Sequence, residues 1–177
     1  MVFSQFKIFA GLLGAVSMAG ALAAAEVDVR PEQEQIAQCL TKDMKTARVL
    51  VTVEDIMSDE GNLRLQVYSD NPDDFLEGGK KLVRIDVPAK KDSKQVCVTL
   101  PRAGDYALVV LHDRNGNGRA NFFSEGFGFS NNPELNLAPP EHEEAVFSAA
   151  NGVKKMQISL NYVLESSDDK KKRRRRR

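Results

Sequence analysis

The chain has 177 residues, with 25 basic and 25 acidic side chains and a formal net charge of zero. This length suits one domain with tails rather than several domains. The charge is unevenly distributed: residues 170–177 are all basic, whereas residues 26–169 carry a net charge of about −9, which makes the domain a poor partner for nucleic acid.

The N-terminus has the three parts of a secretory signal peptide. A short start with Lys7 as its one positive charge precedes an apolar stretch over residues 8–22, and small residues follow. The apolar run, about 15 residues, is shorter than the roughly 20 that a membrane anchor needs. We therefore expect residues 1–25 to be a signal peptide that is cleaved after Ala23 or Ala25. The protein that remains is expected to have no transmembrane segment and to be periplasmic or secreted.

Residues 26–45 are polar and predict a linker with one short helical turn at 35–40. Cys39 lies in this linker, and Cys97 lies in the domain that follows. An exported chain folds in an oxidising compartment, and two cysteines allow only one pairing. We therefore favour a Cys39–Cys97 disulfide over two buried free thiols.

Several short segments predict β-strands because they are rich in β-branched residues or alternate apolar with polar residues. They are residues 48–54, 63–68, 82–87, 96–100, 106–111, 145–147 and 156–162. Turn residues at 59–62 predict a hairpin between the first two strands, and Asn151-Gly152 predicts another between the last two. The continuous apolar run at 106–111 is typical of a central strand that is buried on both faces.

About seven short strands and almost no helical periodicity predict an all-β fold. We expect a single β-sandwich over residues 46–164, of immunoglobulin-like or transthyretin-like type, with one long loop. Residues 165–177 are polar and then basic, and predict a disordered tail. That tail either binds anionic lipid or polysaccharide or remains solvated without a partner.

The long loop covers residues 112–144 and begins with a pattern of oxygen ligands. Asp113, Asn115 and Asn117 alternate and a glycine follows, which is the spacing of a Ca²⁺-binding loop. Only one of the three is a carboxylate, and the acid that should close the loop comes one residue late, at Glu125. The alternative is that the asparagines form tight turns through hydrogen bonds to their own backbone.

The second half of the loop combines aromatic and polar residues. Phe127 and Phe129 alternate with glycines and precede a Ser-Asn-Asn sequence. Such side chains suit a surface that binds a sugar or peptide; alternatively, they fix the loop to the sandwich and satisfy its backbone groups. The candidate ligand-binding residues are His112, Glu125, Phe127, Phe129, Ser130, Asn131 and Asn132.

Residues 100–118 and 125–132 resemble the bacterial domain-of-unknown-function family 2141. The resemblance lies in His-Asp-Arg-Asn-Gly-Asn-Gly and Glu-Gly-Phe-Gly-Phe-Ser-Asn-Asn, and it extends over residues 47–163. It implies an exported protein and no established activity. The Pro-x-x-Gly-x-Tyr entry into a strand is similar to that of transthyretin-like and carboxypeptidase-regulatory-like sandwiches. Residues 119–124 are shorter than in members of the family, which argues against a complete cation loop.

These patterns favour a non-catalytic binding module of the periplasm or cell envelope, with polysaccharide, lipid or protein as the partner. The alternatives are a structural envelope protein without a ligand, a weak Ca²⁺-binding module and a hydrolase that uses His112 and Asp113. The hydrolase is disfavoured because adjacent residues of a strand point to opposite faces. We therefore expect no catalytic residues and, apart from Ca²⁺, no cofactor.

Overall fold

The computed structural model describes residues 32–121, 123–135 and 138–163. The predicted signal peptide with its two cleavage sites, the first part of the predicted linker and the basic tail lie outside these residues.

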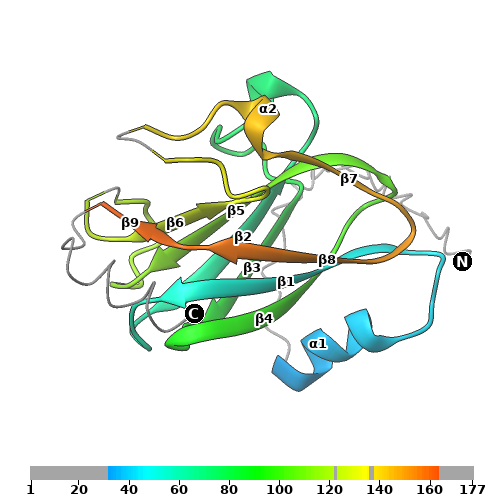
Figure 1. Cartoon of the computed structure of the whole chain (residues 1–177), viewed down its shortest axis with the longest axis horizontal. Coiled ribbons are helices and arrows are strands. Elements are labelled where there is room, and N and C mark those ends of the chain that lie inside the picture. The colour runs from blue at the N-terminus through cyan, green and yellow to red at the C-terminus, as the bar shows by residue number, and fades with distance from the viewer. Residues whose placement is uncertain (1–31, 122, 136–137, 164–177) are drawn as a thin grey trace, which may run out of the picture.

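Two β-sheets pack face to face and confirm the all-β sandwich (Figure 1). The three-stranded sheet has the order β4 (Asp92–Thr99), β1 (Ala47–Ile56) and β8 (Gly152–Ser159). The six-stranded sheet has the order β3 (Val83–Pro88), β2 (Asn62–Tyr68), β5 (Gly104–Asp113), β6 (Gly126–Phe129) and β9 (Asn161–Tyr162), and β7 (Val146–Ala149) also pairs with β5. The described residues thus form nine strands where about seven were expected.

Alternation of side chains along each strand builds the core between the sheets. On β1, Val49, Val51 and Val53 face inward and are fully buried. Inward residues of the six-stranded sheet, such as Leu65 and Leu108, pack against them in the same cluster. Each buried side chain of this size stabilises the fold by about 1.5–3 kcal/mol relative to its exposed state. The prediction that β5 is a central strand buried on both faces is confirmed, because residues 106–113 are all buried.

The predicted hairpin between the first two strands is wrong. β1 pairs antiparallel with β4 and parallel with β8, whereas β2 belongs to the other sheet. The pairing of β1 with β4 becomes irregular between Glu54 and Ile56, where Asp55 has a φ of 61°. The strand therefore bends at its end, and residues 57–61 carry the chain from one sheet to the other.

The predicted hairpin at Asn151-Gly152 is also wrong. β7 pairs with β5 and β8 pairs with β1, so the turn at Asn151 joins the two sheets instead of two paired strands. The predicted last strand, 156–162, divides at Leu160 into β8 and β9, which lie in different sheets. Its inward alternation is nevertheless confirmed, since Ile158, Leu160 and Tyr162 belong to the core.

The predicted long loop contains regular structure of its own. His112 and Asp113 are the last residues of β5, and strand β6 and the short helix α2 (His142–Ala145) follow within it. A second short helical segment, η1 (Pro72–Asp74), lies in the connection from β2 to β3.

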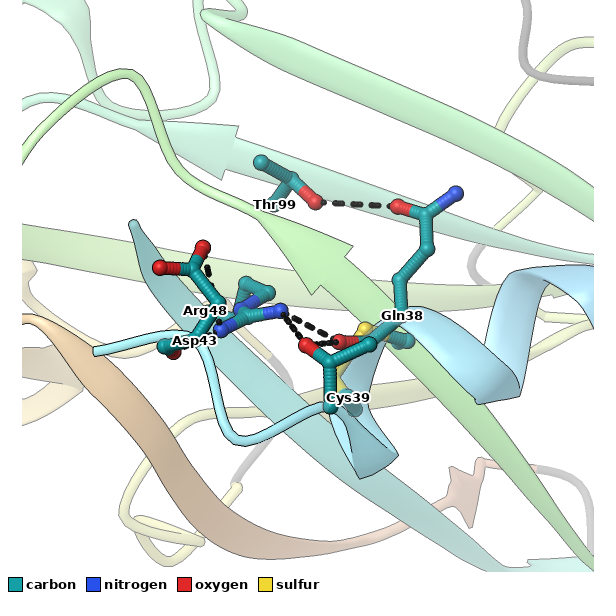
Figure 2. Close-up of a disulfide and its surroundings, with 7 residues drawn as sticks. Gln38, Cys39, Asp43, Arg48 and Thr99 are labelled. Carbon is teal, nitrogen blue, oxygen red and sulfur yellow. Dashed lines mark hydrogen bonds and ion pairs between the residues drawn. A yellow bond between two sulfur atoms is a disulfide. The ribbon is translucent and has the colours of Figure 1, made fainter. Parts of the chain in front are cut away.

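Helix α1 (Glu32–Leu40) lies against the outer face of the three-stranded sheet, on the side of the molecule opposite α2 (Figure 1). The expected disulfide, Cys39–Cys97, joins it to β4 and packs against Leu50. Arg48, only 4% exposed, holds the end of the helix by donating hydrogen bonds to the Gln38 carbonyl, the Thr41 hydroxyl and the Asp43 carbonyl (Figure 2). The predicted linker is thus, from residue 32 onward, a covalently attached layer of the domain.

No helix within the described residues is long and apolar enough to cross a membrane.

Removal of the disulfide is expected to lower the free energy of unfolding substantially. The bridge closes a separation of 58 residues, and the chain-entropy model then gives a loss of about 4 kcal/mol. Urea unfolding of the wild type and of a Cys39→Ser/Cys97→Ser double variant measures this difference. Thiol titration of the unfolded, unreduced wild type should find no free thiol, and two free thiols would contradict the bridge.

Candidate functional site

The end of β5 sends two predicted site residues to opposite faces of the six-stranded sheet. Leu108 and Val110 face the core between the sheets, and His112 continues this inward row. Asp113 lies on the outer face with Leu111, where its carboxylate contacts Arg64 of the neighbouring strand. Both His112 and Asp113 are buried, at 0% and 1% exposure.

His112 closes one end of the sandwich through two hydrogen bonds. Its Nε2 lies 2.8 Å from the Glu60 carbonyl oxygen, which can only accept, so Nε2 carries the proton. Its Nδ1 lies 2.6 Å from the Tyr162 hydroxyl and accepts the hydrogen bond that this hydroxyl donates. The same hydroxyl oxygen accepts a hydrogen bond from the Met57 amide at 3.1 Å. Burial lowers the pKa of His112, which keeps the ring neutral.

These bonds leave the hydrolase hypothesis without its geometry. Both ring nitrogens of His112 are occupied by Glu60 and Tyr162, and Asp113 lies on the other face of the strand. The other histidine, His142, packs at 5.5 Å from the Phe75 ring and reaches the Ser69 carbonyl at 3.3 Å. Each histidine is thus placed as part of the packing.

The Ser-Asn-Asn sequence after β6 fixes the chain to its neighbours. The Ser130 hydroxyl accepts from the Leu108 amide at 3.0 Å and donates to the Ala145 carbonyl. Asn131 donates to the carbonyls of Glu144 and Val146, and Asn132 exchanges two bonds with the backbone of β8. The side-chain polar atoms of these three candidate ligand residues are therefore hydrogen-bonded to backbone groups. The two asparagines also have positive φ values, of 67° and 50°, which asparagine tolerates better than most residues.

The Gly-Phe-Gly-Phe sequence of β6 has a packing reason. A Cβ at Gly126 would lie 2.4 Å from the Tyr162 ring, and one at Gly128 would lie 2.6 Å from Ile158 Cγ2. Only glycine lets β6 approach the C-terminal strands this closely. The alternation then places Phe127 and Phe129 together on the outer face of the sheet.

This outer face carries a groove of about 350 Å³. Its apolar floor comes from three adjacent strands and consists of Tyr68, Val109, Leu111, Phe127 and Phe129. Arg64, Gln66 and Lys81 bring polar groups into it, and Leu76, Gly118 and Pro139 line it from the surrounding loops. Burial raises the pKa of Tyr68 to about 12, so its hydroxyl is uncharged at neutral pH.

The two cationic side chains of the groove, Arg64 and Lys81, differ in whether carboxylates lie beside them. Arg64 is held between two carboxylates, at 2.7 Å from Asp86 and 3.4 Å from Asp113, and also donates to the Gly118 carbonyl. Lys81 lies 5.9 Å from the centre of the Tyr68 ring and donates to the Glu77 carbonyl. A carbonyl does not neutralise an ammonium group, whereas the two carboxylates do neutralise Arg64.

Three polar residues of the groove were not predicted from the sequence: Arg64, Gln66 and Lys81. They lie on β2 and in the β2–β3 connection, some 45 to 65 residues before Phe127 and Phe129. Alternation with apolar residues predicted a half-buried strand that contains Arg64, Gln66 and Tyr68. This local pattern does not indicate which strand pairs with it.

The Asp113 loop has the turns that its asparagines suggested. The amide oxygens of Asn115 and Asn117 accept from backbone amides two residues later, at 2.9 and 2.8 Å, and Asp113 Oδ2 accepts from the Gly118 amide at 2.8 Å. Within the described residues, no three histidine, cysteine or acidic side chains gather around one possible metal position. The acidic side chains that are buried in this loop are those of Asp113 and Glu125.

Fold and site together define a β-sandwich with an apolar groove on the outer face of its larger sheet. The chain belongs to the bacterial family described as "Uncharacterized protein conserved in bacteria (DUF2141)", whose model matches residues 51–157. This confirms the resemblance found in the sequence. Neither the curated proteins nor the solved structures contain a significant match.

Acidification from pH 7.5 to 5.5 is expected to destabilise the protein through His112. The unfolded chain takes up a proton near the ordinary value of 6.5, whereas burial lowers the pKa of the folded ring, so the unfolded state binds more protons in this range. The contribution of His112 to the free energy of unfolding is therefore fully present above about pH 6.5 and is lost as the pH falls below that value. Thermal melts should show a falling Tm in the wild type and a flatter profile in His112→Gln.

The matched control is His142→Gln, which removes the other histidine and leaves His112 in place. It should keep the wild-type dependence on pH. An unchanged profile in His112→Gln would contradict the assignment.

Proposed function

We propose that this chain is a non-catalytic binding module of the periplasm or cell envelope that takes a small amphipathic anion into the groove. The observation that carries the proposal is the combination of an apolar floor, which includes Phe127, with the ammonium group of Lys81 above the Tyr68 ring of the same groove. Ligand sites are typically concave, largely apolar and equipped with a few polar groups that fix the orientation of the ligand.

The composition of the groove favours a lipid-type ligand among the three partner classes considered. A saccharide needs many hydrogen-bond partners, and the asparagines expected to supply them, Asn131 and Asn132, bond to the backbone instead. Gln66 and Lys81 suit one polar head, and the volume of about 350 Å³ suits a short acyl chain or one aromatic ring.

The disulfide supports the extracytoplasmic location. Disulfides persist in oxidising compartments and are rare in the cytosol of most organisms. Cys39–Cys97 has a Cα–Cα distance of 5.7 Å, within the usual range for such bridges. The apolar N-terminal sequence agrees with export.

A structural role without a ligand is the second candidate. It is favoured by the hydrogen bonds of His112, Ser130, Asn131 and Asn132, which use these side chains to hold the fold together. Under this hypothesis the groove is only a gap between the sheet and its loops.

Binding of octanoate distinguishes the two candidates. Calorimetric titration of the wild type should give saturable binding, with weaker binding of octanol, which lacks the charge, and of maltose. Lys81→Gln should weaken octanoate binding by at least about tenfold, since a charge-assisted hydrogen bond contributes about 1.5–3 kcal/mol. Lys90→Gln, at an exposed lysine outside the groove, is the matched control and should bind as the wild type does.

The two phenylalanines should respond differently to truncation. Phe129 is 4% exposed and packs against Phe75, so Phe129→Ala is expected to cost about 3 kcal/mol of folding free energy. Phe127 is only half-buried, so Phe127→Ala should cost less stability and should weaken octanoate binding. Failure of octanoate to bind the wild type would favour the structural role. So would binding to Phe127→Ala and Lys81→Gln that is as tight as binding to the wild type.

Export has its own test. Expression of the full chain in a bacterial host, followed by N-terminal sequencing of the protein in the periplasmic extract, should find a start at Ala24 or Glu26. A protein that keeps Met1 and remains in the cytoplasm would contradict this part of the proposal.

A further inference from the structure

Two acidic side chains are buried beside each other at the end of the outer face. Asp113 and Glu125 are each 1% exposed, although one ends β5 and the other precedes β6. Asn115, two residues after Asp113, donates from its side-chain nitrogen to Glu125 Oε1 at 3.3 Å. Placing two carboxylates in a water-poor environment is costly unless a positive charge compensates for them.

One of these carboxylate oxygens has no hydrogen-bond partner. Three buried side-chain polar atoms of the described residues are unsatisfied: Arg48 Nε, Arg114 Nε and Asp113 Oδ1. The first two are donors, so Asp113 Oδ1 is the single acceptor among them. An unsatisfied buried carboxylate oxygen is unusual in a folded protein and is a position where a water molecule or an ion binds.

The charges around Asp113 and Glu125 do not cancel. Arg64 and Arg84 face Asp86 and Asp113, which makes two positive and two negative charges. Glu125 is the additional negative charge, and its partners are the Asn121 amide at 2.8 Å and the neutral Asn115. These contacts leave one negative charge of the described residues in the cluster without a compensating cation.

From this arrangement we infer that the loop binds one Ca²⁺ ion, with Asp113 Oδ1 and the Glu125 carboxylate as charged ligands and the side-chain oxygens of Asn115 and Asn117 as neutral ligands. Glu125 takes the place of the acid that closes a Ca²⁺ loop, although it lies one residue beyond the usual position. Ca²⁺ suits this set better than Mg²⁺, because it accepts irregular geometry and several protein oxygens, whereas Mg²⁺ retains its water. This inference does not depend on the ligand of the groove.

Two carboxylates with Arg64 nearby predict weak binding. Extracellular Ca²⁺ modules have dissociation constants of about 10⁻⁴ to 10⁻³ M, and this site should lie in that range. Ca²⁺ at 10 mM should therefore raise the Tm of the full chain by on the order of 5 °C relative to EDTA, because the ion binds the native state only. Mg²⁺ at the same concentration should produce a smaller rise.

Glu125→Gln separates a cation ligand from a structural residue. The amide oxygen can still accept from the Asn121 amide, although the longer bond from Asn115 is lost, and the substitution removes one of the two neighbouring buried charges. Because these two changes offset each other, the variant in EDTA should be about as stable as the wild type, yet calorimetric titration with CaCl₂ should show binding at least tenfold weaker. Glu134→Gln, at an exposed acid in the same loop region, is the matched control and should keep the wild-type response.

Two results would overturn the inference: a wild type that does not respond to 10 mM Ca²⁺ in either measurement, and an equal response in Glu125→Gln. A spectrum of the ¹⁵N-labelled wild type keeps the test decisive if a variant fails to fold. Addition of Ca²⁺ should shift backbone amide signals at residues 113–125, and shifts confined to other parts of the chain would place the ion elsewhere and contradict the assignment.

Discussion

The alternation of side chains along β5 is the constraint on which the rest of the structure depends. This strand pairs with β2, β6 and β7 and is buried on both faces. Its inward row forms the core and ends at His112, whereas its outward row forms the floor of the groove and ends at Asp113. A shift of register by one residue would exchange the two rows, bringing a carboxylate into the core and a histidine to the groove.

The unusual residues of the long loop fall into two groups because of this arrangement. The polar residues that follow β6 bond to the backbone of β5, β7 and β8 and thereby hold both sheets in place. The two phenylalanines lie on the outer face because the glycines that alternate with them are needed on the inner one, where Tyr162 and Ile158 approach. Close packing on one face of β6 therefore determines the aromatic surface on the other.

The sequence predicted the strands well and their partners poorly, for a physical reason. Alternation along one segment reveals that it has a buried face, and this located β1, β2, β4 and β5. Pairing depends on segments far apart in the chain: β1 lies between β4 and β8, and a turn sequence as strong as Asn151-Gly152 joins two sheets. The candidate site divides in the same way. Phe127, Asp113 and Asn115 stand out locally, but Arg64 and Lys81 become part of the groove only through tertiary structure.

The two outer faces of the sandwich differ in how they are covered, and this difference explains the position of the groove. On the three-stranded sheet, α1 is attached by the disulfide and by Arg48, and it covers Leu50 and the bridge itself (Figure 2). On the six-stranded sheet loop residues such as Phe75 and Leu135 pack against the cluster that contains Phe129, and a groove remains that Tyr68 and Leu111 help to line. A helix presents a continuous face to a sheet, whereas loops contact it at separate points. The groove therefore lies on the face whose helical cover is limited to the four residues of α2, and the buried carboxylates of Asp113 and Glu125 lie at the end of this same face.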